Sequence, residues 1–150
     1  MKRIILLILT SILLITACSK AEVPKYNDPE EALRAYFTAL YHEDWEILAL
    51  LYGGDAEELA GYNSSIDKNN VPELLKSYCK INGGQIVQID KILNRKDISS
   101  DEVEFTVTCI DQEGKPFKVR STEWEHDEFR FTVKQIGDSY KVMTLPPYQA

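Results

Sequence analysis

Histidine and cysteine are scarce in this chain, which has two His and three Cys among its 150 residues. Metal centres draw mainly on these residue types together with carboxylates. His42 stands beside acidic residues where a helix is expected to end, and His126 lies in the acidic stretch STEWEHDEF. Neighbouring side chains on an extended segment point in opposite directions, so this stretch does not gather its ligands on one side. We therefore predict no metal site and no catalytic histidine.

Positive charge is also in short supply, because 17 lysines and arginines stand against 24 Asp and Glu, for a net charge of −7. No stretch of five to eight basic residues is present, although nucleic-acid binding and adhesion to anionic lipid both need clustered positive charge. The Gly53-Gly54 and Gly83-Gly84 pairs follow predicted helices rather than strands, which is the wrong context for a phosphate-binding loop. No nucleophile elbow appears either. These absences exclude nucleic acid as a partner and leave no motif for a cofactor.

A long hydrophobic run is missing as well. The apolar stretch 4–15 is broken only by Thr10 and Ser11 and has twelve residues. A helix that spans a bilayer needs about 20. A short apolar run behind Lys2 and Arg3 is the layout of a secretory signal.

Cys18 closes this stretch in a specific context. The sequence Ile15-Thr16-Ala17-Cys18 resembles the bacterial lipobox. In proteins with that motif the cysteine sulfur receives a diacylglyceryl group, and a peptidase then cuts before the cysteine. Two or more acyl chains give stable anchoring, at about 0.8 kcal/mol per buried CH₂. The alternative is an ordinary secretory peptide in which Cys18 is incidental.

The lipobox interpretation divides the chain into four parts. Residues 1–17 are the predicted signal peptide, 18–27 the lipidated cysteine and a tether, 28–146 the folded domain and 147–150 a tail. The mature chain then carries 15 basic against 24 acidic residues, a net charge of −9. We expect an extracytoplasmic protein on the cell membrane or the outer membrane, with the lipid on Cys18 as its contact with the membrane.

Two cysteines remain, Cys79 and Cys109. An even pair in an exported chain is compatible with a disulfide. Two buried free thiols, packed as small hydrophobic side chains, are the alternative.

Three helices are expected. In NDPEEALRAYFTALYHED, Asp28 can act as the N-cap and Pro29 suits the first helical position. DWEILALLYGG predicts a second helix, which Gly53-Gly54 would end by taking the left-handed conformation. VPELLKSYCKINGG predicts a third helix. The polar stretch 61–70, between the second and third helices, predicts a loop.

The second half has the period of two that is typical of strands. QIVQIDKIL is apolar on both faces and predicts a central strand, followed by a hairpin loop at 94–101. DEVEFTVTCI and FRFTVKQI alternate, and PFKVRST and YKVMTL are expected to be further strands. The side chains expected to face inward, none of which titrates, are Leu33, Phe37, Leu40, Leu48, Leu51, Val103, Phe105, Val107, Phe129, Phe131 and Val133.

Helices followed by antiparallel strands predict an α+β fold, in which the helices cover the apolar face of a curved sheet of four to five strands. The chain also resembles small bacterial lipoproteins with a nuclear-transport-factor-2-like (cystatin-like, cone-shaped) domain of unknown function. The resemblance covers residues 28–146 and is carried by Pro29-Glu30-Glu31, Tyr36-Phe37 with Ala39, Asp44-Trp45, CKINGGQIVQIDKIL and GDSYKVMTL. These motifs are structural and imply the fold rather than an activity.

Aromatic residues of the helices could line a pocket in such a cone, or could simply be core: Tyr36, Tyr41, Trp45, Tyr52 and Tyr78. Two functions follow. The first is a non-catalytic binding or interaction domain for a small amphipathic ligand or an envelope protein. The alternative is an isomerase-like or dehydratase-like enzyme that uses a tyrosine and an acid inside the cone. A filled cone favours the first, and a buried carboxylate or histidine facing a tyrosine in a deep cavity favours the second.

Overall fold

The computed structural model describes residues 24–121 and 123–149. The predicted signal peptide and Cys18 lie outside these residues. Four helices come first, and none of them is long and apolar enough to cross a membrane within the described part of the chain. They are α1 (Pro29–Tyr41), α2 (Trp45–Leu51), α3 (Ala56–Gly61) and α4 (Val71–Ile81).

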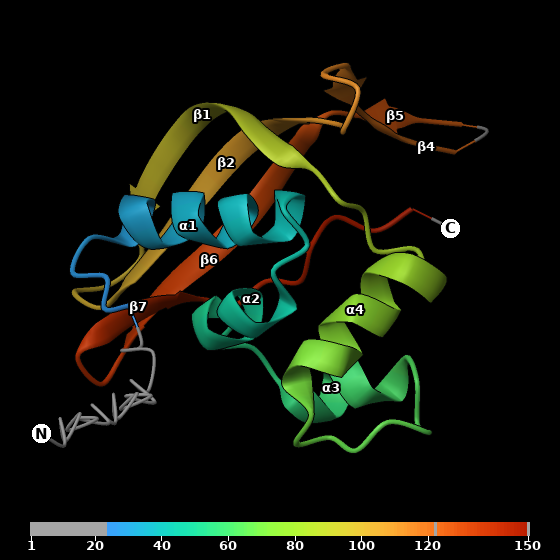
Figure 1. Ribbon diagram of the computed structural model, residues 1–150. Coiled ribbons are helices and arrows are strands. Elements are labelled where there is room, and N and C mark those ends of the chain that lie inside the picture. Colours follow the sequence, from blue (N-terminus) through green and yellow to red (C-terminus); the bar gives the residue numbers. More distant parts are fainter. Residues whose placement is uncertain (1–23, 122, 150) are drawn as a thin grey trace, which may run out of the picture.

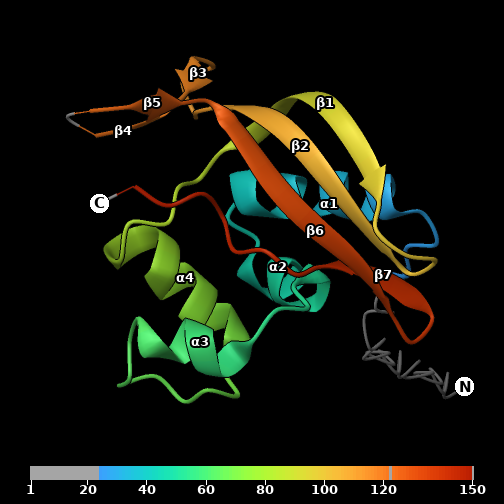
Figure 2. The ribbon, with the colours of Figure 1, turned by 180° about the vertical axis from the view of Figure 1, so that it is seen from behind.

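The sheet is antiparallel, in the order β1-β2-β6-β7, with the short β3 paired to β2. It is curved, and α1 lies across its concave face (Figure 1). A separate two-stranded hairpin, β4 with β5, projects beyond one end of it (Figure 2). The strands are β1 (Gln88–Asp97), β2 (Glu102–Ile110), β3 (Pro116–Phe117), β4 (Val119–Arg120), β5 (Glu125–His126), β6 (Glu128–Ile136) and β7 (Ser139–Val142). The structure therefore confirms the predicted α+β fold with helices on a curved sheet.

Helix α1 begins as its sequence predicts. The Asp28 carboxylate accepts hydrogen bonds from the backbone N–H groups of Glu30 and Glu31, at 2.9 and 3.0 Å. This satisfies two of the N–H groups that a helix start leaves without a partner. The stripe of Leu33, Phe37 and Leu40 is buried against the sheet.

The core fills the part of the concave face that α1 covers. We call this part the filled face and define it by Leu33, Phe37, Phe105, Phe131 and Val133, each at most 1% exposed. The rings of Phe37 and Phe131 meet edge to face, with centroids 4.8 Å apart. All eleven side chains predicted to face inward are buried, so this part of the prediction is confirmed.

Strand β1 corrects one prediction, because it lies at the edge of the sheet and is mostly exposed. Ile89, Ile92 and Arg95 pair with Cys109, Val107 and Phe105 of β2, which alternate along one face. Residues three apart on β1 therefore meet residues two apart on β2, because two register shifts lie between them. The bulges put Ile89 and Ile92 on the same face and twist an edge strand that would otherwise invite pairing. The strand also runs on to Asp97, into the expected hairpin loop.

The end of α2 corrects a second prediction. Positive φ angles among the described glycines occur at Gly83, Gly114 and Gly137, and not at Gly53 or Gly54. Tyr52 ends the helix by turning extended, and the Gly53 N–H then donates to the Val142 carbonyl at 2.8 Å. The two glycines therefore carry the chain along the β7 edge, and a third small helix, α3, follows that the sequence analysis did not assign.

The end of the sheet also differs from its prediction. β7 stops at Val142, and residues 143–148, here called the C-terminal segment, make two further hydrogen bonds to Thr132 of β6 and then run past the helices. Two tyrosines hold this segment. The Tyr36 hydroxyl donates to the Thr144 carbonyl at 3.2 Å, and the Tyr78 hydroxyl donates to the Pro146 carbonyl at 3.1 Å.

The predicted tether makes contacts before α1 begins. The Tyr26 N–H donates to the Ser139 hydroxyl, and its carbonyl accepts from the Tyr140 N–H, both at 2.9 Å. Lys25 forms an ion pair with Asp138 in the turn between β6 and β7. The chain is thus fastened to the β6–β7 turn by residues 25 and 26.

Candidate functional site: a tyrosine-lined pocket

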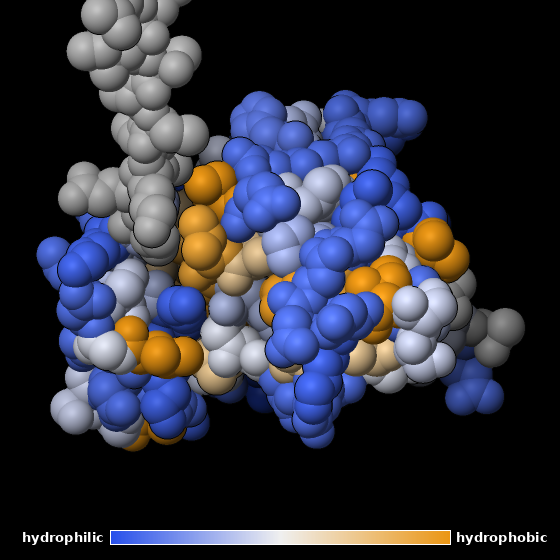
Figure 3. Space-filling view, turned by 60° about the horizontal axis from the view of Figure 1, so that its bottom comes forward, coloured by the Kyte–Doolittle hydropathy of each residue, from blue (hydrophilic) through white to orange (hydrophobic). Residues whose placement is uncertain are grey.

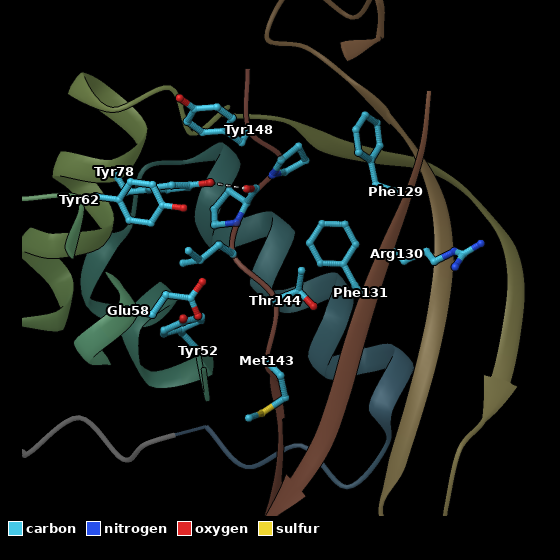
Figure 4. Close-up of a pocket in the computed structure, with 13 residues that line it drawn as sticks. Tyr52, Glu58, Tyr62, Tyr78, Phe129, Arg130, Phe131, Met143, Thr144 and Tyr148 are labelled. Carbon is cyan, nitrogen blue, oxygen red and sulfur yellow. Dashed lines mark hydrogen bonds between the residues drawn. The ribbon is translucent and has the colours of Figure 1, made fainter. Parts of the chain in front are cut away.

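A cavity of about 480 Å³ opens where the helices and the sheet diverge. We call it the tyrosine pocket, after Tyr52, Tyr62, Tyr78 and Tyr148, which line it together with Glu58. The helices supply one wall, β6 supplies the opposite wall, and the C-terminal segment passes between them (Figure 4). The remaining lining residues are Phe129, Arg130, Phe131, Met143, Thr144, Leu145, Pro146 and Pro147.

The four tyrosines differ in exposure. Tyr52, the residue after α2, and Tyr78 on α4 are buried, at 6% and 2% exposure. Tyr62, at the end of α3, and Tyr148 are 41% and 49% exposed. Tyr78 touches both exposed rings, because its centroid lies 4.8 Å from that of Tyr62, edge to face, and 6.4 Å from that of Tyr148. The buried pair therefore forms the wall, and the exposed pair forms the rim.

Two glycines let the buried tyrosines take these positions. A Cβ atom at Gly84 would lie 2.4 Å from ring carbons of Tyr78, and one at Gly54 would lie 2.3 Å from the Tyr52 hydroxyl oxygen. Both distances are far inside van der Waals contact. Each glycine is needed for a close approach and not for a left-handed turn.

The pocket keeps its buried hydroxyls protonated. Burial, followed by the charges of Glu58 and Asp55, raises the pKa of Tyr52 to about 12. Burial, followed by the neighbouring Tyr62, raises the pKa of Tyr78 well above its usual value. A phenol with a raised pKa remains neutral at physiological pH, so these groups can donate hydrogen bonds but are poor bases.

Two charged residues line the pocket, and they face in different directions. Arg130 lies between Phe129 and Phe131 on β6, so strand alternation sends its side chain to the convex face of the sheet. Figure 4 shows its guanidinium pointing away from the cavity, whereas the carboxylate of Glu58 lies beside Tyr52 on the cavity side. Glu58 itself is exposed to water.

The structure brings together only part of the predicted aromatic set. Tyr52 and Tyr78 line the pocket. Tyr36 is fully buried in the core instead, and burial raises its pKa well above the usual value. Tyr41 and Trp45 are half-buried and lie outside the lining.

Sequence analysis missed Tyr62, Tyr148 and Glu58. Tyr148 stands in the stretch predicted to be a tail. For Glu58 and Tyr62, the signal in the sequence was Asp55, a residue type that often caps a helix. In the structure the Asp55 carboxylate accepts a hydrogen bond from the Glu57 N–H at 2.8 Å and caps α3.

The two remaining cysteines are both free thiols in the structure. Cys109 is buried on the inward side of β2, and Cys79 is half-buried on α4. Burial raises the pKa of each thiol to about 12. Neither is a reactive nucleophile, because the thiolate is the reactive form.

The two histidines and the acidic stretch around His126 lie apart from the pocket. His126 is exposed on β5 and stacks on Trp124, with centroids 4.9 Å apart, while its neighbour Glu125 binds Lys118 and Arg120. His42 is exposed at the end of α1. Within residues 24–121 and 123–149, no three His, Cys, Asp or Glu gather to hold a metal ion. In the same ranges Ser77 is the one buried polar side chain besides the tyrosines.

Comparison with models of protein families finds no match, and comparison with curated proteins finds none either. Among solved structures, the chain is similar to an NTF-2-like protein of unknown function from Shewanella oneidensis MR-1. The two are 13% identical, the match covers 76% of this chain and 90% of that one, and the TM-score is 0.42. A similarity this distant gives no information about a ligand or an activity. The fold is therefore assigned from the helices and strands described above.

Proposed function

We propose that this protein is a bacterial lipoprotein, anchored outside the cytoplasm by lipid on Cys18, whose domain binds a small amphipathic ligand in the tyrosine pocket without chemical turnover. The single observation that carries the binding role is the pocket itself. It combines four tyrosine rings, the apolar side chains of Phe129 and Phe131 on β6 and a few polar groups, which is the usual composition of a small-molecule site.

Two features favour binding over the enzyme alternative. The concave face beneath α1 is filled by apolar side chains, so the pocket lies beside the core and not deep within a cone. The acid nearest to a pocket tyrosine, Glu58, is exposed, and the raised pKa of Tyr52 suits a hydrogen-bond donor better than a base.

A small ligand fits the face drawn in Figure 3 better than a broad protein partner does. On the face drawn in Figure 3, hydrophobic residues form several small patches that hydrophilic residues separate. Protein interfaces are marked by larger continuous apolar patches. The tyrosine pocket is instead a concave site with a partly exposed aromatic rim.

Two experiments test the proposal. Cells of the native host are labelled with radioactive palmitate, and we expect label on the wild-type protein and none on Cys18→Ala, which should remain as the unprocessed precursor. Absence of label on the wild type would contradict the anchoring. For binding, choline and its uncharged isostere 3,3-dimethylbutan-1-ol are added to the ¹⁵N-labelled full chain in non-ionic detergent. Amide shifts at Tyr62 and Tyr148 with at least one of the two support the site, and none with either refutes it.

A further inference from the structure

The chemistry of the tyrosine pocket selects among amphipathic ligands by charge, and this inference rests on the proposed function. We propose that the pocket binds an organic cation, of the quaternary ammonium kind with an apolar body, over the exposed rings of Tyr62 and Tyr148, which stand against buried Tyr78, and beside the carboxylate of Glu58. Three features of the pocket favour such a ligand: the charge that faces the cavity, the rings that line it, and the space between them.

The charge that faces the cavity is negative. Glu58 is directed toward it and Arg130 away from it (Figure 4). Glu57, the preceding residue on α3, pairs with Lys68 at 2.6 Å. Glu58 forms no ion pair within the described ranges 24–121 and 123–149. The charged groups that act on the Tyr52 hydroxyl are Glu58 and Asp55, both acidic. An anionic ligand would be repelled here, whereas a cation would be attracted.

The rings present the surface that a cation prefers. The face of an aromatic ring carries negative partial charge, and a cation within about 6 Å of the ring centre is attracted to it. Tyr78 is fixed by its hydrogen bond to the Pro146 carbonyl at 3.1 Å. Tyr62 stands edge-on to it at a centroid distance of 4.8 Å and an angle of 72°. Tyr62 and Tyr148, at 41% and 49% exposure, leave ring surface open to a ligand, and several aromatic side chains around one site are the arrangement that recognises quaternary ammonium groups.

The space between the rings suits a ligand with an apolar body. The cavity of about 480 Å³ falls within the range of small-molecule pockets, about 300–1,000 Å³. Phe129 and Phe131 line the wall that β6 forms, and the two prolines of the C-terminal segment also line the cavity. A methylated ammonium group is weakly hydrated and loses little when it is transferred onto these surfaces. A primary ammonium group holds its water more strongly and should bind less well.

Choline and 3,3-dimethylbutan-1-ol differ only in the charged nitrogen that replaces a carbon, so they measure the preference for charge at constant shape. Binding is followed by amide shifts on the full chain in non-ionic detergent, with the free concentration of each probe set by dialysis. We expect choline to bind about tenfold more tightly than the alcohol, as a cation over several rings beside a carboxylate should.

Four variants assign the preference to residues. Glu58→Gln should remove most of the tenfold difference, and its matched control, Glu57→Gln on the same helix, should leave it unchanged. Tyr62→Leu should weaken choline several-fold, whereas Tyr62→Phe, which keeps the ring, should not. Tyr62 is 41% exposed and Glu58 is exposed, so these variants should fold.

The outcomes separate this inference from the function on which it rests. If the alcohol binds as tightly as choline, or if Glu58→Gln and Glu57→Gln behave alike, the cation preference is refuted while the binding site stands. If neither probe shifts the pocket amides, the proposed function fails, and this inference fails with it. Choline binding that resists Tyr62→Leu would place the cation elsewhere and also overturn the inference.

Discussion

The two halves of the sheet's inner side are built differently. Under α1 the filled face is closed by Leu33, Phe37, Phe105, Phe131 and Val133, which are almost entirely buried. Beside it, where α3 and α4 face β6, the lining changes to tyrosine and leaves a cavity of about 480 Å³. Phe131 belongs to both halves, so the change takes place across a single side chain.

This difference shows how one sheet can serve stability and binding at once. Phenylalanine and leucine contribute by burial alone and can fill space without hydrogen-bonding partners. Tyrosine can cover the same area but needs a partner for its hydroxyl when it is buried, and Tyr36 and Tyr78 both find one in the C-terminal segment. The filled face should therefore carry most of the stability, and the exposed rim of the tyrosine pocket should be tolerant of change.

The largest effect is expected from Phe105→Ala in the filled face. Phe105 is fully buried, and truncation of such a ring costs about 3–5 kcal/mol because a cavity is left behind. Tyr148→Ala at the pocket rim should cost under about 1 kcal/mol, since the side chain is half-exposed. Urea denaturation followed by circular dichroism measures both. Equal losses would remove the distinction between the two halves.

A smaller effect is expected from Gly84→Ala, which places a methyl group against the buried wall of the tyrosine pocket. The added Cβ would lie 2.4 Å from Tyr78, and forced overpacking of this kind costs about 1–3 kcal/mol. Gly61→Ala is the matched control, because nothing lies within 4 Å of its added Cβ and alanine favours a helix by about 0.5–1 kcal/mol. The same urea denaturation should show opposite signs for the two variants, and a stable Gly84→Ala protein would contradict the close packing.

Alkaline pH should reveal the buried thiols. Cys79 and Cys109 have ordinary pKa values of 9.0 and folded values of about 12. Between these limits the unfolded chain has lost the proton and the folded chain has kept it, so the free energy of unfolding falls as the pH rises. The slope is at most about 1.4 kcal/mol per pH unit for each thiol, starting near pH 9. Tyr52 adds in the same direction above pH 10, toward its folded value of about 12.

The double variant Cys79→Ala, Cys109→Ala is the control for this slope, and its stability should decline only from about pH 10. In the native protein a thiol reagent should modify half-buried Cys79 before buried Cys109. In the unfolded, unreduced protein we expect both thiols to titrate. Failure of both to react would establish the disulfide that the sequence left open.

The smallest effects are expected from the two tyrosines that hold the C-terminal segment. Tyr36→Phe and Tyr78→Phe each remove one hydrogen bond to a backbone carbonyl, worth about 0.5–1.5 kcal/mol. Thermal unfolding should show similar losses for the two variants. Choline shifts should change only with Tyr78→Phe, because Tyr36 lies outside the pocket lining. A change with Tyr36→Phe would mean that the hydrogen bond from Tyr36 to Thr144, which lines the pocket, also shapes the site.

Much of the filled face could be predicted from the sequence, because single elements carry it. The stripe on α1 and the alternation on β2 each report which residues face inward, and neither depends on a distant part of the chain. The position of β1 at the edge of the sheet could not be predicted, because its two bulges change the spacing of its inward residues from two to three. In the sequence, a bulge appears only as an interruption of the alternation between apolar and polar residues. The same interruption is expected for a strand that is buried on both faces.

The tyrosine pocket was harder to predict for a different reason. Its lining comes from the end of α2, from α3, α4 and β6, and from the C-terminal segment, so no local pattern contains it. The sequence indicates Tyr52 and Tyr78 as candidate lining residues, but it does not indicate the rim residues Tyr62 and Tyr148. Tyr148 joins the pocket only because β7 ends at Val142 and frees the last residues to cross to the helices.

The attachment at residues 25 and 26 has a mechanical consequence. Two hydrogen bonds from Tyr26 to Ser139 and Tyr140, and one exposed ion pair from Lys25, join the leading segment to the β6–β7 turn. A pull on the N-terminal side loads these few contacts one after another, before it reaches the first turn of α1 and the core behind it. The contacts of Lys25 and Tyr26 should therefore break first, while the domain stays folded. Release of residues 24–27 would lengthen the leading segment by roughly 13 Å at about 3.3 Å per residue, and this added length would relieve the pull before it reaches the fold.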